Sequence, residues 1–136
     1  MTAPEAQRAV GAGSTHDVAV HAGRDLPSLV LTLVRWALVA EFLVAGAAKL
    51  LSMPAMVVLF SAVGLGQWFR YATGGWEIMG AVLLALPRTS GLGAAALSAL
   101  MLGAAVTEVV VLRRIPVSSV GTLAALLVIV WSRANR

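Results

Sequence analysis

The sequence predicts an all-α membrane protein, a four-transmembrane-helix bundle with a short interfacial helix between the first and second spans. Three observations predict this fold: an apolar composition, four long apolar runs, and short connections between them. Of the 136 residues, 60% are hydrophobic and 12% are charged, whereas soluble domains have about 45–50% apolar and about 25% charged residues. The mean hydropathy of +0.91 agrees with the membrane class.

The four spans are expected at about residues 28–51, 71–87, 91–112 and 115–132, which together form a transmembrane domain over residues 28–136. A helix needs about 20 apolar residues to cross the bilayer. Residues 1–27 are small, polar and mixed in charge and lack an apolar signal-peptide core, so they predict a flexible N-terminal tail. Between the first two spans, Ser52 and Pro54 indicate a helix start, and Gly64 and Gly66 indicate its end. The resulting helix, at about residues 53–64, is too short to span and is expected at the interface.

Charge and composition exclude several functions. The net charge is +4, but the arginines lie mostly at the ends of apolar runs, where they anchor to headgroups, so we expect no nucleic-acid partner. The chain has no cysteine, and both histidines, His16 and His21, lie in the N-terminal tail. We therefore expect no metal site and no intrinsic cofactor, and we do not expect the chain to be catalytic alone.

An even number of spans places both termini on the same side of the membrane. With the termini inside, the inner side carries five arginines (Arg8, Arg24, Arg88, Arg133, Arg136) and the outer side three (Arg70, Arg113, Arg114). Short loops rich in Arg and Lys stay in the cytoplasm. The sequence therefore predicts a multi-pass protein of the cell membrane with both termini cytoplasmic.

The first span contains charges within 41-EFLVAGAAKL-50, with Arg35 upstream. A charge at the bilayer centre costs about 2.5–3.5 kcal/mol on insertion scales. Glu41 and Lys49 are about 12 Å apart along the helix axis, and Arg35 and Glu41 about 9 Å, which is too far for a direct pair. Their partners must therefore lie on other helices, in water or on a ligand.

The ends of the first and third spans share a membrane side with the start of the second span. Lys49, Glu77 and Glu108 should therefore lie within about 10 Å of one surface and form one polar cluster, which Arg70 and Arg113 can join. Glu41 is expected deeper, and Arg35 toward the opposite face. Two interpretations stay open: these charges join the helices structurally, or they form a polar pocket that binds a ligand. The candidate residues are Arg35, Glu41, Lys49, Trp76, Glu77 and Glu108.

Two rows of residues at four-residue spacing indicate close helix packing. The third span carries Gly91, Ala95, Ala99 and Gly103, and the first carries Ala37, Glu41, Ala45 and Lys49. Small residues let membrane helices approach closely. The rows either pack inside the bundle, which is the favoured interpretation, or join copies of the chain into a homo-oligomer.

Four motifs occur in order: 45-AGAAKL-50, 60-FSAVGLG-66, 75-GWEIMGAVLLALPR-88 and 98-SALMLGAAVT-107. From about Leu33 to Trp131 the chain thus resembles the DoxX-like family of small four-span membrane proteins. By position, the recurring polar residues of that family fall on Arg35, Lys49 and Glu77. The loop RRIPVSS has no cysteine, which argues against the branch related to methylamine utilisation proteins.

The resemblance implies an accessory role. Some relatives are small membrane subunits of thiosulfate:quinone oxidoreductase, and others resemble partners of superoxide dismutase and sulfurtransferase in a membrane assembly. We therefore expect an accessory, quinone- or lipid-binding subunit of a membrane redox or stress-related assembly. Its expected partners are membrane lipid and a soluble or membrane oxidoreductase, and its expected ligand is quinone.

Two alternatives stay open. Glu41 lies eight residues before Lys49, which also resembles the small multidrug resistance family and would imply a proton-coupled small-molecule transporter. The third span, however, lacks the glycine and tryptophan pattern of that family. The second alternative is a non-catalytic scaffold or chaperone for another membrane protein, a role found among more distant eukaryotic relatives.

Overall fold

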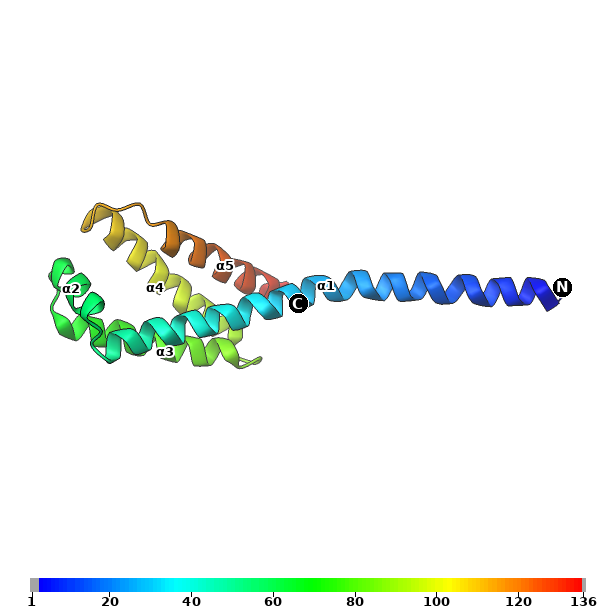
Figure 1. Ribbon diagram of the computed structural model, residues 1–136, viewed down its shortest axis with the longest axis horizontal. Coiled ribbons are helices and arrows are strands. Elements are labelled where there is room, and N and C mark those ends of the chain that lie inside the picture. The colour runs from blue at the N-terminus through cyan, green and yellow to red at the C-terminus, as the bar shows by residue number, and fades with distance from the viewer. Residues whose placement is uncertain (1–2, 136) are drawn as a thin grey trace. The chain divides into compact units, whose positions relative to one another are not determined.

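The computed structural model describes the backbone of residues 3–135 and the side chains of residues 27–135. Within that part the chain folds into the helices α1 (Ala3–Leu50), α2 (Pro54–Val63), α3 (Gln67–Ala85), α4 (Ser90–Val110) and α5 (Val117–Ala134), shown in Figure 1. Contacts divide the chain into two units, Met1–Leu33 and Val34–Arg136. In the first unit the chain is helical from Ala3. The side chains of residues 1–26 lie outside the described part, and the flexible tail stays a prediction.

Three described helical segments are long and apolar enough to cross a membrane: Pro27–Leu50 of α1, α4 and α5. Helix α3 has 19 residues, a similar length, but it carries Arg70 and Glu77. Helix α2 has ten residues, which is too few to cross a bilayer. The all-helical fold predicted by the sequence is thus present, with three clear candidate spans.

The boundaries of α2 and α3 follow from the local sequence. Pro54 begins α2, and Gly64 ends it in a left-handed conformation with a φ of 80°, which glycine adopts without steric cost. Helix α3 begins at Gln67, directly after Gly66 at a φ of 86°. This start precedes the predicted span by one turn, because residues 68–71 are already helical.

In the second unit, α3 packs against α4, α4 against α5, and α2 against α3. Residues 34–50 of α1 run beside α3 (Figure 1). The connections at residues 86–89 and 111–116 are short, so α3, α4 and α5 alternate in direction. Consequently the end of α1, the start of α3 and the α4–α5 connection lie at one end of the unit, together with α2 (Figure 1).

The core of the second unit is formed by four helices. Its buried apolar side chains are Leu38, Val39 and Phe42 of α1, Ala81 and Leu84 of α3, Ala94 and Leu97 of α4, and Leu126 and Ile129 of α5. Because each of these helices contributes to one cluster, the core fixes the faces that they turn toward one another.

Glycines set the closest helix contacts. A Cβ atom at position 93 of α4 would lie 2.8 Å from the carbonyl carbon of Leu83 and 2.9 Å from the carbonyl oxygen of Gly80, both in α3. A Cβ atom at position 46 of α1 would lie 2.9 Å from the carbonyl oxygen of Gly74. Only glycine permits such backbone approach, so these positions hold α3 against both of its long neighbours.

The predicted small-residue row of α4 lies on a different face. Ala95, Ala99 and Gly103 are exposed, whereas Gly93 and Ala94 are buried. The expectation that this row packs inside the bundle is therefore wrong for the fold of a single chain. The neighbouring face carries the contact with α3, because it combines Gly93 with the core residues Ala94 and Leu97.

Candidate functional site

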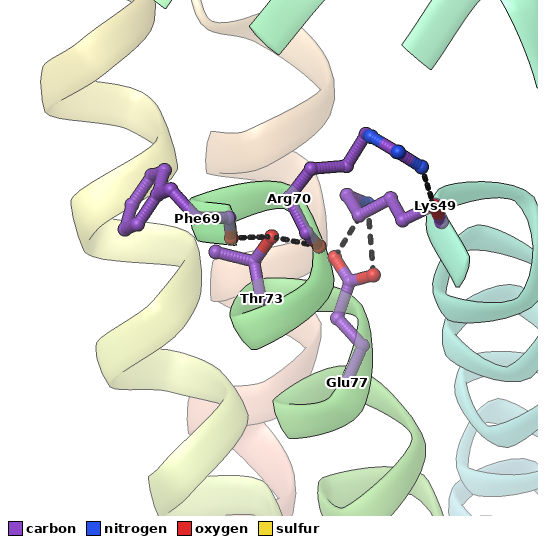
Figure 2. A network of polar contacts seen from close by, with 5 residues as sticks. All are labelled: Lys49, Phe69, Arg70, Thr73 and Glu77. Carbon is purple, nitrogen blue, oxygen red and sulfur yellow. Dashed lines mark hydrogen bonds and ion pairs between the residues drawn. The ribbon is translucent and has the colours of Figure 1, made fainter. Parts of the chain in front are cut away.

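A buried ion pair joins α1 to α3. The Nζ atom of Lys49 donates to both carboxylate oxygens of Glu77, at 2.9 Å to Oε1 and 2.8 Å to Oε2. The two side chains are 13% and 5% exposed. Figure 2 shows the Lys49 ammonium directly above the Glu77 carboxylate. The close approach of the helices at Gly46 and Gly74 brings these side chains within reach.

Arg70, at the start of α3, is only 2% exposed. Its Nε donates to Oε1 of Gln67 at 2.8 Å, and its Nη2 donates to Oγ of Ser52 at 2.9 Å. Its Nη1 donates to the backbone carbonyl of Lys49, toward which it points in Figure 2. The predicted joining of Arg70 to the polar cluster thus occurs through a main-chain oxygen, not through a carboxylate.

The backbone geometry at the end of α1 presents the carbonyl of Lys49 to Arg70. Ser52 adopts a left-handed conformation, with a φ of 56°. The backbone N–H groups of Ser52 and Met53 donate to the carbonyls of Lys49 and Ala48, at 3.3 and 3.1 Å, which is the Schellman pattern of a helix end. Arg70 adds a charged donor to a carbonyl at the negative end of the helix dipole. It thereby fixes the backbone that positions the Lys49 ammonium.

A cavity of about 310 Å³ lies beside this ion pair, within the second unit. Its aromatic walls come from Phe42 of α1, Phe60 of α2 and Phe69 of α3. The charged residues that line it are Glu41, Lys49, Glu77, Glu108 and Arg114, and its hydroxyl-bearing residues are Thr73, Thr107 and Ser119. Mostly apolar walls with a few polar groups are typical of small-molecule sites.

Two carboxylates of the cavity have hydroxyl partners from α5. Thr122 donates to Oε1 of Glu41 at 3.0 Å, and Ser119 donates to Oε2 of Glu108 at 2.8 Å. Ser119 and Thr122 are three residues apart, so they lie on one face of α5. Among the side chains described, the Lys49–Glu77 pair is the only ion pair, so Glu41 and Glu108 have no basic partner there.

Of the six predicted site residues, four line this cavity: Glu41, Lys49, Glu77 and Glu108. Trp76 does not; its indole N–H donates to the carbonyl of Ala96 at 3.3 Å, across the α3–α4 contact. Arg35 does not line it either, and its guanidinium lies 5.7 Å from the ring centre of Trp36. That the cavity binds a ligand stays a prediction.

The sequence reasoning missed Ser119 and Thr122. Their signal was present, because Ser119 and Thr122 are hydroxyl residues at a spacing of three in a mostly apolar span. It also expected Arg113 near the cluster, whereas Arg114 lines the cavity. Arg113 takes a left-handed conformation, with a φ of 49°. In the part that the structure describes, no group of three His, Cys, Asp or Glu side chains could hold a metal ion.

Comparison with known protein families gives a match over most of the chain. Residues 32–132 match the family model described as the DoxX-like family. No curated protein matches the chain, and no solved structure matches it.

Proposed function

This chain belongs to the DoxX-like family, and from that premise we propose that it is a four-span accessory subunit whose cavity binds quinone. The assembly it serves is a membrane redox or stress-related complex. The observation that carries the proposal is the cavity of about 310 Å³ beside the Lys49–Glu77 ion pair. The family and the three apolar helices make the chain a multi-pass membrane protein. The fourth span, the ligand and the partner belong to the proposal.

Helix α3 is the proposed fourth span. Its 19 residues are about 28 Å long at 1.5 Å per residue, close to the hydrocarbon thickness of about 30 Å. Its charged side chains, Arg70 and Glu77, are both buried and have polar partners inside the protein. Charges that face the bundle interior and are paired are compatible with a membrane span. Helix α2 then lies at the interface, beside the start of α3.

Cysteine labelling tests this topology, because the chain has no cysteine of its own. We expect Leu65→Cys and Ile115→Cys to react with a membrane-impermeant maleimide on intact cells. Arg88→Cys and Asn135→Cys should react only after permeabilisation, because they follow α3 and α5 and face the cytoplasm. Labelling of positions 65 and 88 from the same side would show that α3 does not cross the membrane.

The walls of the cavity support quinone as the ligand. Phe42, Phe60 and Phe69 offer aromatic faces to a flat ring. An ammonium has three N–H donors, and Lys49 directs two contacts at Glu77, which leaves a donor for a quinone carbonyl. A volume of about 310 Å³ is at the lower end of ligand sites. It therefore suits the ring and the first part of a tail.

The residues also support an accessory role. A protein that oxidises or reduces quinone by itself needs a redox-active group of its own. The chain has no cysteine, and therefore no thiol that could serve as this group. Its histidines, His16 and His21, lie outside the transmembrane domain predicted from the sequence. A partner oxidoreductase would therefore supply or accept the electrons, and this subunit would position the quinone in the membrane.

Filling the cavity tests the function. Ala104 lines the cavity from α4, so Ala104→Phe places a ring inside it without removing a charge. We expect the affinity for a short-chain quinone to fall at least about tenfold, because the new ring occupies volume that the ligand needs, and the ligand could then enter only with strain. The measurement is a titration of the purified protein in mild detergent, followed by tryptophan fluorescence.

The matched control is Ala124→Phe, which adds the same ring at an exposed position of α5 and should leave the affinity unchanged. Equal quinone binding by the wild type and Ala104→Phe would refute the cavity as the site. Loss of binding in both variants would point to a general defect in folding, which size-exclusion chromatography of each variant detects.

A further inference from the structure

We propose that the end of the second unit opposite the cavity is a binding site for the headgroup of an anionic phospholipid. Its basic residues are Arg35 of α1, Arg88 of the α3–α4 connection and Arg133 in the last turn of α5, which we call the arginine end. This inference is independent of the proposed quinone site, because none of these residues lines the cavity.

The register of α1 against α3 brings Arg35 to the level where α3 ends, because Arg35 precedes Gly46 by eleven residues and Ala85 follows Gly74 by eleven, and Gly46 and Gly74 are in contact. Residues close in sequence to the three arginines also pack against the core. Val34, Ala85 and Val130 all pack against the one core cluster. Arg35 directly follows the first of these residues, and Arg88 and Arg133 follow the other two by three residues.

Two further observations support this placement. A Cβ atom at Gly91, in the first turn of α4, would lie 3.9 Å from the Cβ of Arg133. Figure 1 shows the end of α3, the start of α4 and the end of α5 at the same end of the unit. Arg88 and Arg133 are both exposed there.

The charge of this end is not neutralised by side chains of the described part. The acidic residues among positions 27–135 are Glu41, Glu77 and Glu108, and all of them line the cavity. The arginine end therefore has three positive charges and no acidic side chain within that part of the chain. Such a patch attracts anions at the membrane surface.

Arg35 supplies a specific sign of a missing partner. Its Nε is buried, and among the described residues 27–135 it has no hydrogen-bond partner. Leaving a buried donor without an acceptor costs free energy, so an unpaired donor in a native fold calls for an acceptor from outside the described part of the chain. A phosphate oxygen is the acceptor that the planar guanidinium binds best, through two parallel hydrogen bonds.

Tryptophans set the depth of this end in the membrane. Trp36 is 51% exposed and Trp131 is 70% exposed. Exposed tryptophans concentrate at the headgroup level of the bilayer, where lipid phosphates lie. In the proposed topology this end faces the cytoplasmic leaflet, which is the leaflet rich in anionic lipid. A phospholipid therefore fits the site better than free phosphate does.

The test is native mass spectrometry of the full chain in mild detergent, titrated separately with phosphatidylglycerol and phosphatidylcholine. We expect one phosphatidylglycerol to bind in preference to phosphatidylcholine. Arg35→Gln should weaken that binding about tenfold, the loss expected for one charge-assisted contact to phosphate. Arg133→Gln should weaken it too. The matched control is Arg113→Gln, which removes an exposed arginine at the opposite end and should leave binding unchanged.

Three outcomes would overturn the proposal. The first is equal binding of the two lipids by the wild type. The second is an equal loss of binding in Arg113→Gln and Arg35→Gln, since this would show a non-specific charge effect. The third is full displacement of the lipid by millimolar inorganic phosphate, because the site would then recognise free phosphate. Arg35→Lys keeps the positive charge but lacks the planar pair of N–H donors of the guanidinium. Partial retention of phosphatidylglycerol binding by this variant therefore separates lost recognition from lost folding.

Discussion

Replacing Lys49 with methionine is expected to destabilise the protein by about 3–5 kcal/mol, because it leaves the Glu77 carboxylate buried without its charged partner. Glu77→Met should destabilise the protein by a similar amount, because it leaves the Lys49 ammonium buried without its carboxylate partner. Glu77 is only 5% exposed and Lys49 13%, so solvent offsets little of either loss. The measurement is equilibrium unfolding of the purified protein in mixed micelles of mild detergent and dodecyl sulfate.

The double variant Lys49→Met/Glu77→Met separates the pair from its surroundings. It should be far more stable than either single variant, because replacing a whole buried pair by apolar residues is often nearly neutral. The control, Arg113→Met, removes an exposed arginine and should change stability by no more than about 0.5 kcal/mol. Additive losses in the double variant would contradict the direct ion pair.

Replacing Gly93 with alanine is expected to destabilise the fold by about 1–3 kcal/mol, because the new methyl group forces two packed helices apart. Its Cβ would meet the backbone of Leu83 at 2.8 Å and the carbonyl oxygen of Gly80 at 2.9 Å, and neither can move without moving α3. The same unfolding assay measures the effect.

Gly103 provides the comparison for this substitution on the same helix. A Cβ atom there meets nothing within 4 Å, so Gly103→Ala should leave stability unchanged or raise it by up to about 1 kcal/mol through better helix propensity. Equal losses at the two positions would show that α3 and α4 do not pack through Gly93.

The helices were predictable because their signals are local. Apolar runs, Pro54 and the glycines at 64 and 66 mark where helices begin and end. The positions of Lys49, Glu77 and Glu108 around one cavity were also predictable, because short connections fix which helix ends share a side. The predicted position of each charge along its helix was thus enough to predict that Lys49, Glu77 and Glu108 lie close together.

The faces of the helices were not predictable in the same way. Helix α4 is apolar or small on every side, so periodicity does not show which small residues face the core. The row at Gly91, Ala95, Ala99 and Gly103 therefore indicated the wrong face, beside the face that carries Gly93 and Ala94. Homo-oligomerisation through the exposed row stays a prediction.

The main-chain partner of Arg70, the carbonyl of Lys49, was not predictable for a different reason. Sequence reasoning pairs an arginine with a carboxylate, but the free carbonyls at a helix end are acceptors too. The end of α1 exposes the carbonyl of Lys49 to Arg70, and Ser52 adds its hydroxyl. Only the three-dimensional position of the α1 end beside α3 shows this contact.

The proposed function requires that the cavity hold a small molecule from the membrane. Native mass spectrometry of protein solubilised from its own membranes in mild detergent tests it most directly. We expect one bound mass matching a quinone on the wild type and on Ala124→Phe, and none on Ala104→Phe. A wild-type protein that carries no such mass, or an Ala104→Phe variant that retains it, would contradict the claim.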